Sequence, residues 1–306
     1  MGVLQYWQVG AVRVPTRVRE TAPAKINLGL KVMRRRDDGY HDVLSVVQTI
    51  DLCDHLVFDR LDEDVIRLTC SDPALPTGPE NLVVKAATAL RDRLGGGCGV
   101  HIHLEKEIPS EGGLGGGSSD AAATLRGLNR LWGANAGDDL LLETAASIGS
   151  DVPFLLKPGT AVVSGRGERL QYVEMTGPLV YVLVLPEARV STPRAFQNVK
   201  IGLTKRSPYI SLLSSLRGSE RLDSDRLLGC LENDFLPMVV DENPEIAGCM
   251  MALRRTLPIA VSLSGTGSTL YGVYADISSG TTAAAALRDA GFKAAICRPL
   301  SALPDF

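Results

Sequence analysis

The sequence has 306 residues, of which 45% are hydrophobic and 22% charged, and its net charge is −3. This composition is typical of a globular protein with one large or two ordinary domains, and the lack of a long basic run argues against duplex nucleic acid as a partner. No apolar stretch approaches the ~18 residues of a membrane span, and the N-terminus shows no signal peptide. We therefore expect a cytoplasmic protein with neither nucleic acid nor a membrane as its partner.

The six cysteines are scattered, with no C-x-x-C pair and no histidine at ligand spacing. This pattern favours reduced thiols in the cytosol and argues against a zinc site. His101 and His103 share one face of a predicted strand, which would allow a metal pair. Because no third ligand is evident, we favour the alternative, a solvent-facing strand edge.

Residues 1–16 are predicted to be an irregular extension with no evident role, and strand-like sequence begins at Arg17. In the segment 22–30, apolar residues alternate with Lys25, Asn27 and Gly29, which is typical of a strand with one buried face. Lys25 and Asn27 would line a site, or they would belong to an ordinary amphipathic edge strand. Both interpretations are open on this segment alone.

A turn signal at 36–39 precedes Tyr40 and His41, a pair that on its own is more often structural than functional. Strands are predicted near 44–59 and 64–70, followed by a proline-rich loop. Asn81 then has the position of an N-cap for a helix that reaches about residue 94.

The glycine-rich segment 112–117 is the most informative stretch of the chain. An alternating strand precedes it, and a helix follows, with Ala121, Leu125, Leu128 and Trp132 on one face. Ser118, Ser119 or Asp120 is the expected N-cap of that helix. A loop of this kind, between a strand and the start of a helix, offers bare backbone N–H groups and a positive helix end to anions.

Known phosphate loops of other types do not match this segment. No lysine follows the last glycine, so the Walker pattern is absent, and G-x-G-x-x-G fails as well. These failures disfavour a Rossmann-type oxidoreductase and a protein-kinase loop. A flexible linker is also disfavoured, because periodic elements flank the glycines closely.

A helix is predicted at 138–148, and Asp151 follows it between a glycine and a proline. This aspartate is a candidate for a partly buried carboxylate that its neighbours hold in place. The alternative is an aspartate that caps a helix or stabilises a turn. Further along we expect a helix entry at 191–196 and a polar connector at 201–225. The remaining expected elements are a strand at 179–185, helices at 226–240 and 244–256, strands at 259–263 and 269–274, a helix at 281–290 and a strand at 292–297. This order suggests an α+β second domain.

Three segments, 23–30, 109–122 and 262–268, resemble in this order the three motifs of the GHMP kinase superfamily, which includes galactokinase, homoserine kinase and mevalonate kinase. The resemblance implies an α+β fold of two domains with the active site in the cleft between them. Residues 17–175 would form an N-terminal ATP-binding domain that is ribosomal protein S5 domain 2-like. Residues 176–306 would form a C-terminal substrate-binding domain, a ferredoxin-like α/β plait.

Within the superfamily, the segment 38–41 most strongly indicates the branch whose acceptor is 4-diphosphocytidyl-2-C-methyl-D-erythritol. The implied reaction is phosphorylation of the 2-hydroxyl of this substrate by ATP with Mg²⁺, in the non-mevalonate route to isoprenoid precursors. Open alternatives are a kinase of the same superfamily for mevalonate, homoserine or a sugar, and a catalytically silent nucleotide sensor. The extension 1–16 departs from the shorter start usual in the family. A monomer or weak homodimer is expected.

The resemblance also assigns roles to individual residues. Asp151 would accept the hydroxyl proton, and Lys25 would hold Asp151 ionised and draw charge from the γ-phosphate. ATP would contact Pro109, Gly112, Gly113, Leu114, Gly115, Gly116, Gly117, Ser118, Ser119, Asn81 and Lys106, with Ser118 or Ser119 near Mg²⁺ and no other metal ligand. The substrate would contact Asn27, Tyr40, His41, Thr192, Phe196, Gly265, Thr266 and Gly267, with the cytosine at Tyr40, His41 and Phe196.

Overall fold

The computed structural model of the protein describes residues 15–96, 99–177, 179–199, 207–216 and 221–303. Most of the extension 1–16, Cys98 and parts of the expected connector 201–225 lie outside these ranges. The other five cysteines are free thiols, and three of them, Cys53, Cys249 and Cys297, are buried.

Residues 17–176, together with the short strand at 221–223, build a seven-stranded sheet. Two long strands, β1 (Arg17–Arg35) and β2 (His41–Leu61), pair antiparallel along most of their length. The C-terminal part of β2 pairs with β4 (Gly99–Glu105), which pairs in turn with β3 (Ile66–Cys70). The N-terminal part of β2 pairs with β5 (Thr160–Gly165). Beyond β5 the sheet continues with β6 (Arg169–Thr176) and β8 (Arg221–Asp223).

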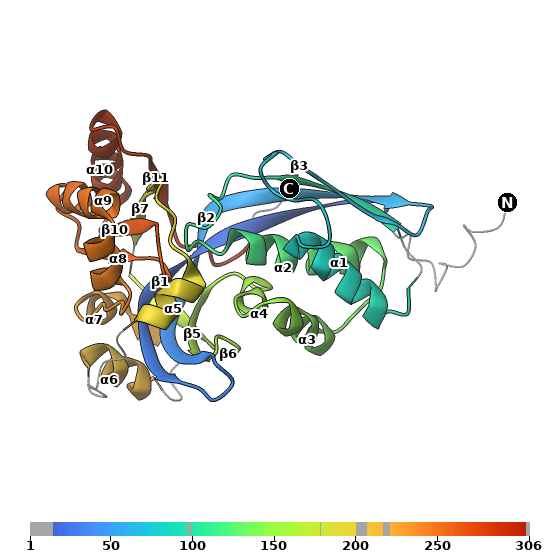
Figure 1. Ribbon diagram of the computed structural model, residues 1–306, viewed down its shortest axis with the longest axis horizontal. Helices are drawn as coiled ribbons and strands as arrows, with labels where there is room; N and C mark the ends of the chain where they lie inside the picture. The colour runs from blue at the N-terminus through green and yellow to red at the C-terminus, as the bar shows by residue number, and fades with distance from the viewer. Residues whose placement is uncertain (1–14, 97–98, 178, 200–206, 217–220, 304–306) are drawn as a thin grey trace.

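Four helices cover one face of this sheet: α1 (Leu82–Arg93), α2 (Gly116–Leu131), α3 (Asp138–Ile148) and α4 (Val152–Leu155) (Figure 1). Ten of the 16 residues of the central helix, α2, are buried, among them all of its alanines and leucines. Its small side chains allow close packing, and a Cβ at Gly127 would lie 2.6 Å from the ring of Phe58 on β2. This packing fixes α2 against the sheet.

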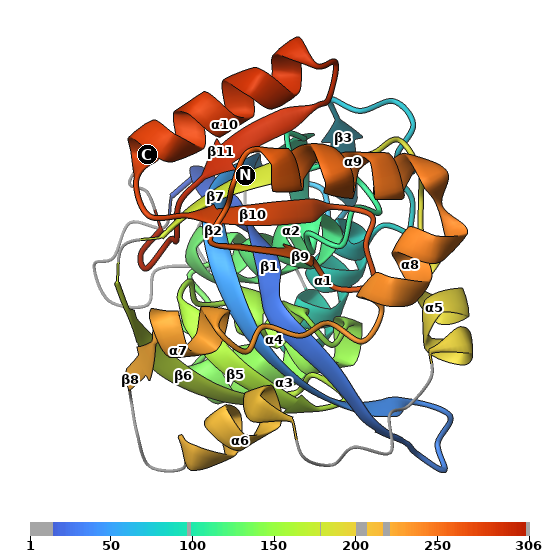
Figure 2. The ribbon, with the colours of Figure 1, turned by 90° about the vertical axis from the view of Figure 1, so that its left-hand side faces the viewer.

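The second half of the chain forms a four-stranded antiparallel sheet from β7 (Val180–Val184), β9 (Ala260–Leu263), β10 (Leu270–Tyr274) and β11 (Ala294–Cys297), in the order β11-β7-β10-β9. Numbered along the chain, this order is 4-1-3-2, which with the intervening helices makes a ferredoxin-like plait. The outer face is covered by α9 (Pro244–Arg255) and α10 (Ile277–Asp289), while β1 and β2 run behind the sheet (Figure 2). Three shorter helices are α5 (Thr192–Asn198), α6 (Pro208–Ser215) and α8 (Leu236–Glu242).

A shared apolar cluster joins the two sheets. It contains Ile26 and Leu28 of β1 together with Tyr181 of β7 and Tyr271 of β10, all fully buried. The hydroxyl of Tyr271 donates to the carbonyl of Asn27 at 2.8 Å. The buried hydroxyl of Tyr271 thus ties the second sheet to the strand that carries Lys25 and Asn27.

The expected α+β class is confirmed, and most expected strands and helices are present within a few residues. The expected connector 201–225 is wrong, because it contains α6, β8 and α7 (Ser224–Leu228). Tyr209 of α6 explains the helix: its buried hydroxyl donates to the carbonyl of Leu28 and accepts from the amide of Val46. The expected helix 226–240 is two helices, α7 and α8, and α10 begins at Ile277 rather than at 281.

Candidate active site

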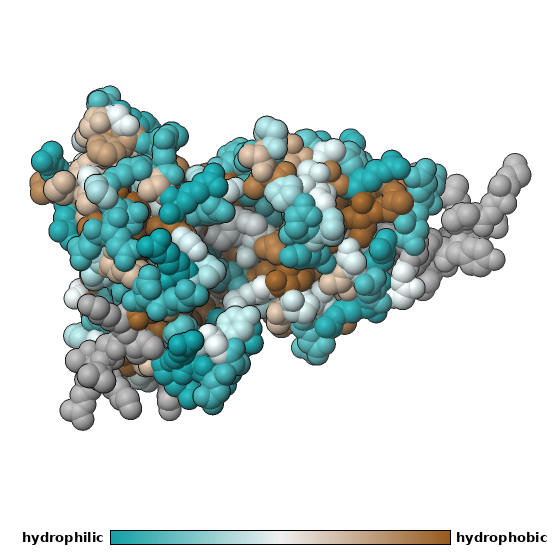
Figure 3. Space-filling view, viewed as in Figure 1, coloured by the Kyte–Doolittle hydropathy of each residue, from teal (hydrophilic) through white to brown (hydrophobic). Residues whose placement is uncertain are grey.

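A cavity of about 1080 Å³ lies where the two sheets meet. Strand β1, the glycine loop, the start of α2 and the segment before α4 line one part of it, and α5 and the turn residues Gly265 and Thr266 line another. In Figure 3 the surface is hollowed between the regions of α5 and α2. The cavity therefore lies between the N-terminal and C-terminal segments of the chain.

The glycine loop is held from behind by its carbonyl groups. The carbonyl of Gly112 accepts from the amide of Thr269, that of Gly113 from the hydroxyl of Ser264, and that of Leu114 from the amide of Lys25. These bonds measure 3.2, 2.8 and 2.9 Å. Because successive carbonyls are engaged with the body of the protein, the loop is fixed without covering its cavity side.

Two positions of this loop require glycine. Gly113 has φ +76°, and a Cβ there would lie 2.3 Å from the carbonyl oxygen of Ser264. Gly115 has φ +71°, and a Cβ there would lie 3.0 Å from the side chain of Lys25. A left-handed backbone and close packing both favour glycine here.

Helix α2 begins at Gly116 with Gly115 as N-cap and no side-chain cap. The expectation of a cap at Ser118, Ser119 or Asp120 is thus wrong, because all three lie within the first turns. Its first N–H groups belong to residues that line the cavity, so the positive end of the helix is directed there.

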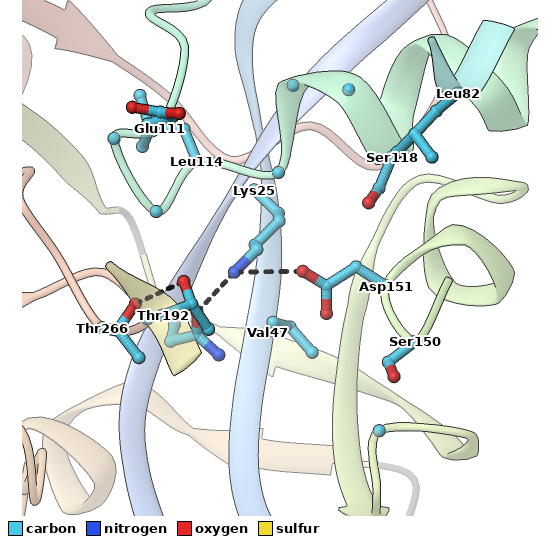
Figure 4. A pocket seen from close by; sticks show the side chains of 18 of the residues that line it. Lys25, Val47, Leu82, Glu111, Leu114, Ser118, Ser150, Asp151, Thr192 and Thr266 are labelled. Atoms are coloured by element: carbon cyan, nitrogen blue, oxygen red, sulfur yellow. Dashed lines mark hydrogen bonds and ion pairs between the residues drawn. The ribbon is translucent and has the colours of Figure 1, made fainter. Parts of the chain in front are cut away.

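The two serines of the loop lie in different environments. Ser118 lines the cavity and extends toward it from α2 (Figure 4). Ser119 is fully buried, does not line the cavity, and donates to the carbonyl of Pro23 at 2.7 Å. The structure therefore contradicts the assignment of Ser119 to phosphate or Mg²⁺ and leaves Ser118 as the serine that faces a ligand.

Lys25 and Asp151 face each other across the cavity (Figure 4). The Lys25 ammonium lies 3.5 Å from an Asp151 carboxylate oxygen and donates to Asn27 Oδ1 at 2.7 Å. Asn27 in turn donates from Nδ2 to Ser45 Oγ at 2.8 Å, which fixes its orientation. Asp151 is the N-cap residue of α4, yet its side chain makes no capping hydrogen bond. The carboxylate is directed at Lys25 instead.

A second cluster of charges lies behind the glycine loop. The ammonium of Lys106 pairs with the buried carboxylates of Asp54 and Asp120, at 2.8 Å from Asp120. Burial would lower the pKa of Lys106, but the charges of Asp120 and Asp54 outweigh it and raise that pKa. Burial, with the nearby Asp54 carboxylate, raises the pKa of Asp120 well above its ordinary value. Asp54 also accepts from the amides of Glu107 and Ile108, so this cluster fixes the approach to the loop.

Apolar side chains line the cavity beside Lys106. They include Leu75, Pro76, Leu82 and Leu104, with Asn81 among them. Asn81 Oδ1 accepts from the amide of Val83 at 2.9 Å and caps α1, as expected. This part of the cavity offers an apolar surface of the kind that accommodates a nucleobase.

Aromatic side chains gather at another part of the cavity. The rings of His41 and Phe196 have centroids 5.3 Å apart, and Phe196 contacts Phe235 edge-on. The guanidinium of Arg166 lies 3.8 Å from the centroid of the Tyr40 ring. Burial and the charge of Arg35 lower the pKa of His41, so its imidazole is neutral at neutral pH.

The turn after β9 brings backbone and hydroxyl groups to the cavity. Thr266 lines it beside Gly265, and its hydroxyl lies 3.0 Å from that of Thr192 (Figure 4). Gly267 does not line the cavity, contrary to expectation, because its amide bonds back to Ser264 and it packs on Leu263. Asn233 donates to the carbonyls of Leu263 and Gly265 and thereby shapes the turn.

Three residues of the site were not predicted from the sequence: Asp54, Asn233 and Arg166. Asp54 lies within a strand and Asn233 in a short connection, and neither carries a local signal. Arg166 stands between two glycines in a turn before Glu168, which is a detectable but weak pattern. Only the fold shows what each of them contacts.

The two histidines of β4 contact a side chain of the neighbouring strand β3. His101 and His103 both contact the hydroxyl of Thr69 on β3, and β4 lies between β2 and β3, so the expected strand edge is wrong. Within the described ranges, no group of three histidine, cysteine or acidic side chains is placed to hold a metal ion. Among the helices of the described residues, none has the length and apolarity to cross a membrane.

Residues 81–159 match the profile of the GHMP kinases N terminal domain. The chain is 40% identical over 275 residues to a 4-diphosphocytidyl-2-C-methyl-D-erythritol kinase of Salinibacter ruber, covering 88% of this chain and 94% of the relative. The corresponding protein of Bacillus subtilis is 38% identical, covering 84% and 88%. A crystal structure of 4-(cytidine 5'-diphospho)-2C-methyl-D-erythritol kinase superposes with a TM-score of 0.72 at 34% identity, covering 92% of this chain and 98% of that one.

The fold and the glycine-loop site are those of a GHMP small-molecule kinase. The three proteins named above match most of this chain at 34% to 40% identity, and these matches define a family within that class. The chain belongs to the family of 4-diphosphocytidyl-2-C-methyl-D-erythritol kinases.

Proposed function

We propose that the protein transfers the γ-phosphoryl group of ATP to the 2-hydroxyl of 4-diphosphocytidyl-2-C-methyl-D-erythritol, within the methylerythritol phosphate route to isoprenoid precursors. The observation that carries this proposal is the Lys25–Asp151 pair at 3.5 Å in a cavity with the glycine loop and an aromatic group along its walls. Family membership supports the choice of acceptor.

ATP would lie with its phosphates against the glycine loop and the start of α2. The loop supplies backbone N–H groups at a positive helix end, and Gly113 and Gly115 allow the chain to approach closely. The base would enter the apolar part of the cavity near Asn81 and Leu82. Lys106 would lie behind the loop and not on the phosphates, because its ammonium already pairs with the carboxylates of Asp54 and Asp120.

Mg²⁺ is expected to accompany ATP in this class of enzyme. It prefers oxygen ligands and keeps several waters, so it needs few protein groups. Ser118 fits this demand, because its side chain lines the cavity in the first turn of α2, whereas Asp120 is already paired with Lys106. When bound, the ion would neutralise charge that develops on the phosphates.

The acceptor hydroxyl would lie between Lys25 and Asp151. Asp151 holds its carboxylate open to the cavity and would receive the hydroxyl proton as the new P–O bond forms. Lys25, almost fully buried, would stabilise the negative charge on the transferring group and keep the carboxylate in position. Asn27 would orient Lys25 and the reacting end of the acceptor.

The cytidine end would enter the aromatic part of the cavity. Tyr40 and Phe196 supply ring faces for stacking, and each stacked base contributes about 1–3 kcal/mol. The neutral imidazole of His41 would bond the edge of the base. Thr192, Gly265 and Thr266 would lie against the methylerythritol, so residues 176–306 would form the substrate-binding domain. Residues 17–175 would hold ATP and also bring Asn27, Tyr40, His41 and Asp151 to the acceptor.

An assay of ADP release with matched acceptors tests this proposal. We expect turnover with 4-diphosphocytidyl-2-C-methyl-D-erythritol and background rates with mevalonate, homoserine and galactose. Phosphorus NMR of the product should show a new monoester on the 2-position. Turnover with another acceptor alone would overturn the proposal, and ATP binding without any turnover would indicate a nucleotide sensor.

We further place the reaction in the cytoplasm, since the five described cysteines are free thiols, as in a reducing compartment. We propose a monomer or weak homodimer, which light scattering across a concentration series tests directly. A stable higher oligomer would contradict it.

A further inference from the structure

Four cationic side chains line the cavity: Lys25, Arg35, Lys106 and Arg166. Lys25 pairs with Asp151, and Lys106 pairs with Asp54 and Asp120. Neither arginine forms an ion pair within the described part of the chain. A polyanionic ligand would therefore meet two cations whose charge no carboxylate contact neutralises.

Arg166 lies in the tight turn between β5 and β6, and this turn contacts two parts of the acceptor site. On one side its guanidinium lies 3.8 Å from the centre of the Tyr40 ring. On the other side its neighbour Gly167 packs on Ser150, to whose Cβ an added Cβ at Gly167 would lie 3.1 Å. Ser150 directly precedes Asp151, and both residues line the cavity (Figure 4). The turn thus connects the aromatic pocket with the catalytic aspartate.

An acceptor with a base at Tyr40 and a hydroxyl at Asp151 must place its middle portion beside this turn. In a nucleoside diphosphate derivative that portion is the diphosphate. A guanidinium binds phosphate oxygens through two parallel N–H bonds, and it keeps its charge at any ordinary pH. The contact with the Tyr40 ring holds the guanidinium at the cavity without neutralising it.

Arg35 meets only part of this description. It stands opposite His41 across the β1–β2 pairing, beside the aromatic pocket. The Arg166 turn, by contrast, packs on the segment that carries Asp151. Asp38 lies near enough for the Arg166 charge to contribute to its lowered pKa, but it is not within ion-pair distance of Arg166.

We propose that Arg166 binds the diphosphate of the acceptor and sets the distance between the bound base and the phosphorylated hydroxyl. This inference rests on the proposed function, because it needs a nucleoside diphosphate derivative as acceptor. It makes Arg166 a specificity-determining residue. Acceptors without a phosphate link would lose its contribution.

A ladder of cytidine, CMP and CDP tests the proposal by calorimetry on the full chain. Wild type should bind CDP more tightly than cytidine. Arg166→Ala should weaken CDP by about 10- to 100-fold, as expected for charge-assisted bonds, and cytidine by less than about threefold. Arg166→Lys, which keeps the charge and loses the fork, should fall between the two. The KM for the full acceptor should rise while that for ATP stays constant.

Arg169→Ala is the matched control, since Arg169 is exposed on the adjacent strand and does not line the cavity. It should leave the ladder unchanged. An equal loss for cytidine and CDP in Arg166→Ala would mean that the residue acts on the base through Tyr40, and this would overturn the proposal. An unchanged ladder, in an enzyme that still phosphorylates the cytidyl acceptor, would overturn it while the proposed function stands. Wild type that binds neither CDP nor the acceptor would refute both.

Discussion

The ammonium of Lys25 and the carboxylate of Asp151 lie 3.5 Å apart, although they come from β1 and from the segment before α4. The lysine side chain is 6% exposed and the aspartate 46%. A nearly buried cation thus faces a half-exposed anion across a cavity. An acceptor hydroxyl that enters there meets a proton acceptor and a positive charge at once.

Ser118 and Ser119 should respond differently to removal of the hydroxyl group. Ser118→Ala should raise the KM for ATP with Mg²⁺ and leave the melting temperature nearly unchanged. Ser119→Ala should leave that KM within about twofold and reduce stability by about 1 kcal/mol, because a buried hydrogen bond to Pro23 is lost. Steady-state kinetics and thermal unfolding of both variants check this, and the reverse pattern would show that Ser119 meets the phosphates.

Gly113→Ala should disrupt the phosphate loop. Besides the strain of a positive φ, its Cβ would collide with the carbonyl of Ser264 at 2.3 Å. Gly95→Ala is the control, since Gly95 has φ +86° and an added Cβ there meets nothing within 4 Å. We expect Gly95→Ala to cost about 1–2 kcal/mol, and Gly113→Ala to cost more and also to weaken ATP binding. Denaturant unfolding and ATP titration measure both, and equal costs with normal ATP affinity would contradict the loop geometry.

His41→Ala should raise the KM for the cytidyl acceptor much more than the KM for ATP. The pH profile gives a second test. Because burial and Arg35 lower the pKa of His41, the imidazole stays neutral above the ordinary histidine value of about 6.5. The acceptor KM of wild type should therefore be flat above that pH and rise only below the lowered pKa. Equal effects of the variant on the two substrates would remove His41 from the base pocket.

Lys106→Met should destabilise the protein through the two carboxylates that it leaves behind. Removal of one side of a buried ion pair costs about 3–5 kcal/mol. The pKa of Asp120 is raised above its unfolded value, so its contribution to stability is present at low pH and lost as pH rises. The deficit of the variant should hence be smaller at pH 5 than at pH 8. Unfolding at both pH values checks this, and a deficit that grows toward acid would contradict it.

Local patterns predicted the elements that carry the site, because the alternation of β1 and the period of α2 reflect burial on one face. They also suggested Lys25 and Asp151 as candidates, but nothing local brings the two together. The expected N-cap of α2 was wrong because Ser119 and Asp120 satisfy long-range partners, Pro23 and Lys106.

Helix α6 was missed for a similar reason. Ser207 and Pro208 do signal a helix start, but the serine-rich sequence masked it. What stabilises α6 is the burial of Tyr209 against Leu28 and Val46, on strands far away in the sequence. The sequence around Asp54 likewise gives no sign that its carboxylate pairs with Lys106, because this pairing forms only when β2 packs beside α2.

The central claim is tested most directly by phosphoryl transfer in Asp151→Asn under single-turnover conditions, with binding of ATP and the cytidyl acceptor measured separately. The asparagine keeps the shape of the site and removes the charge and the proton acceptor. We predict near-normal binding of both substrates and a transfer rate about 10²- to 10⁴-fold below wild type. A variant that transfers the phosphoryl group at the wild-type rate would contradict the account.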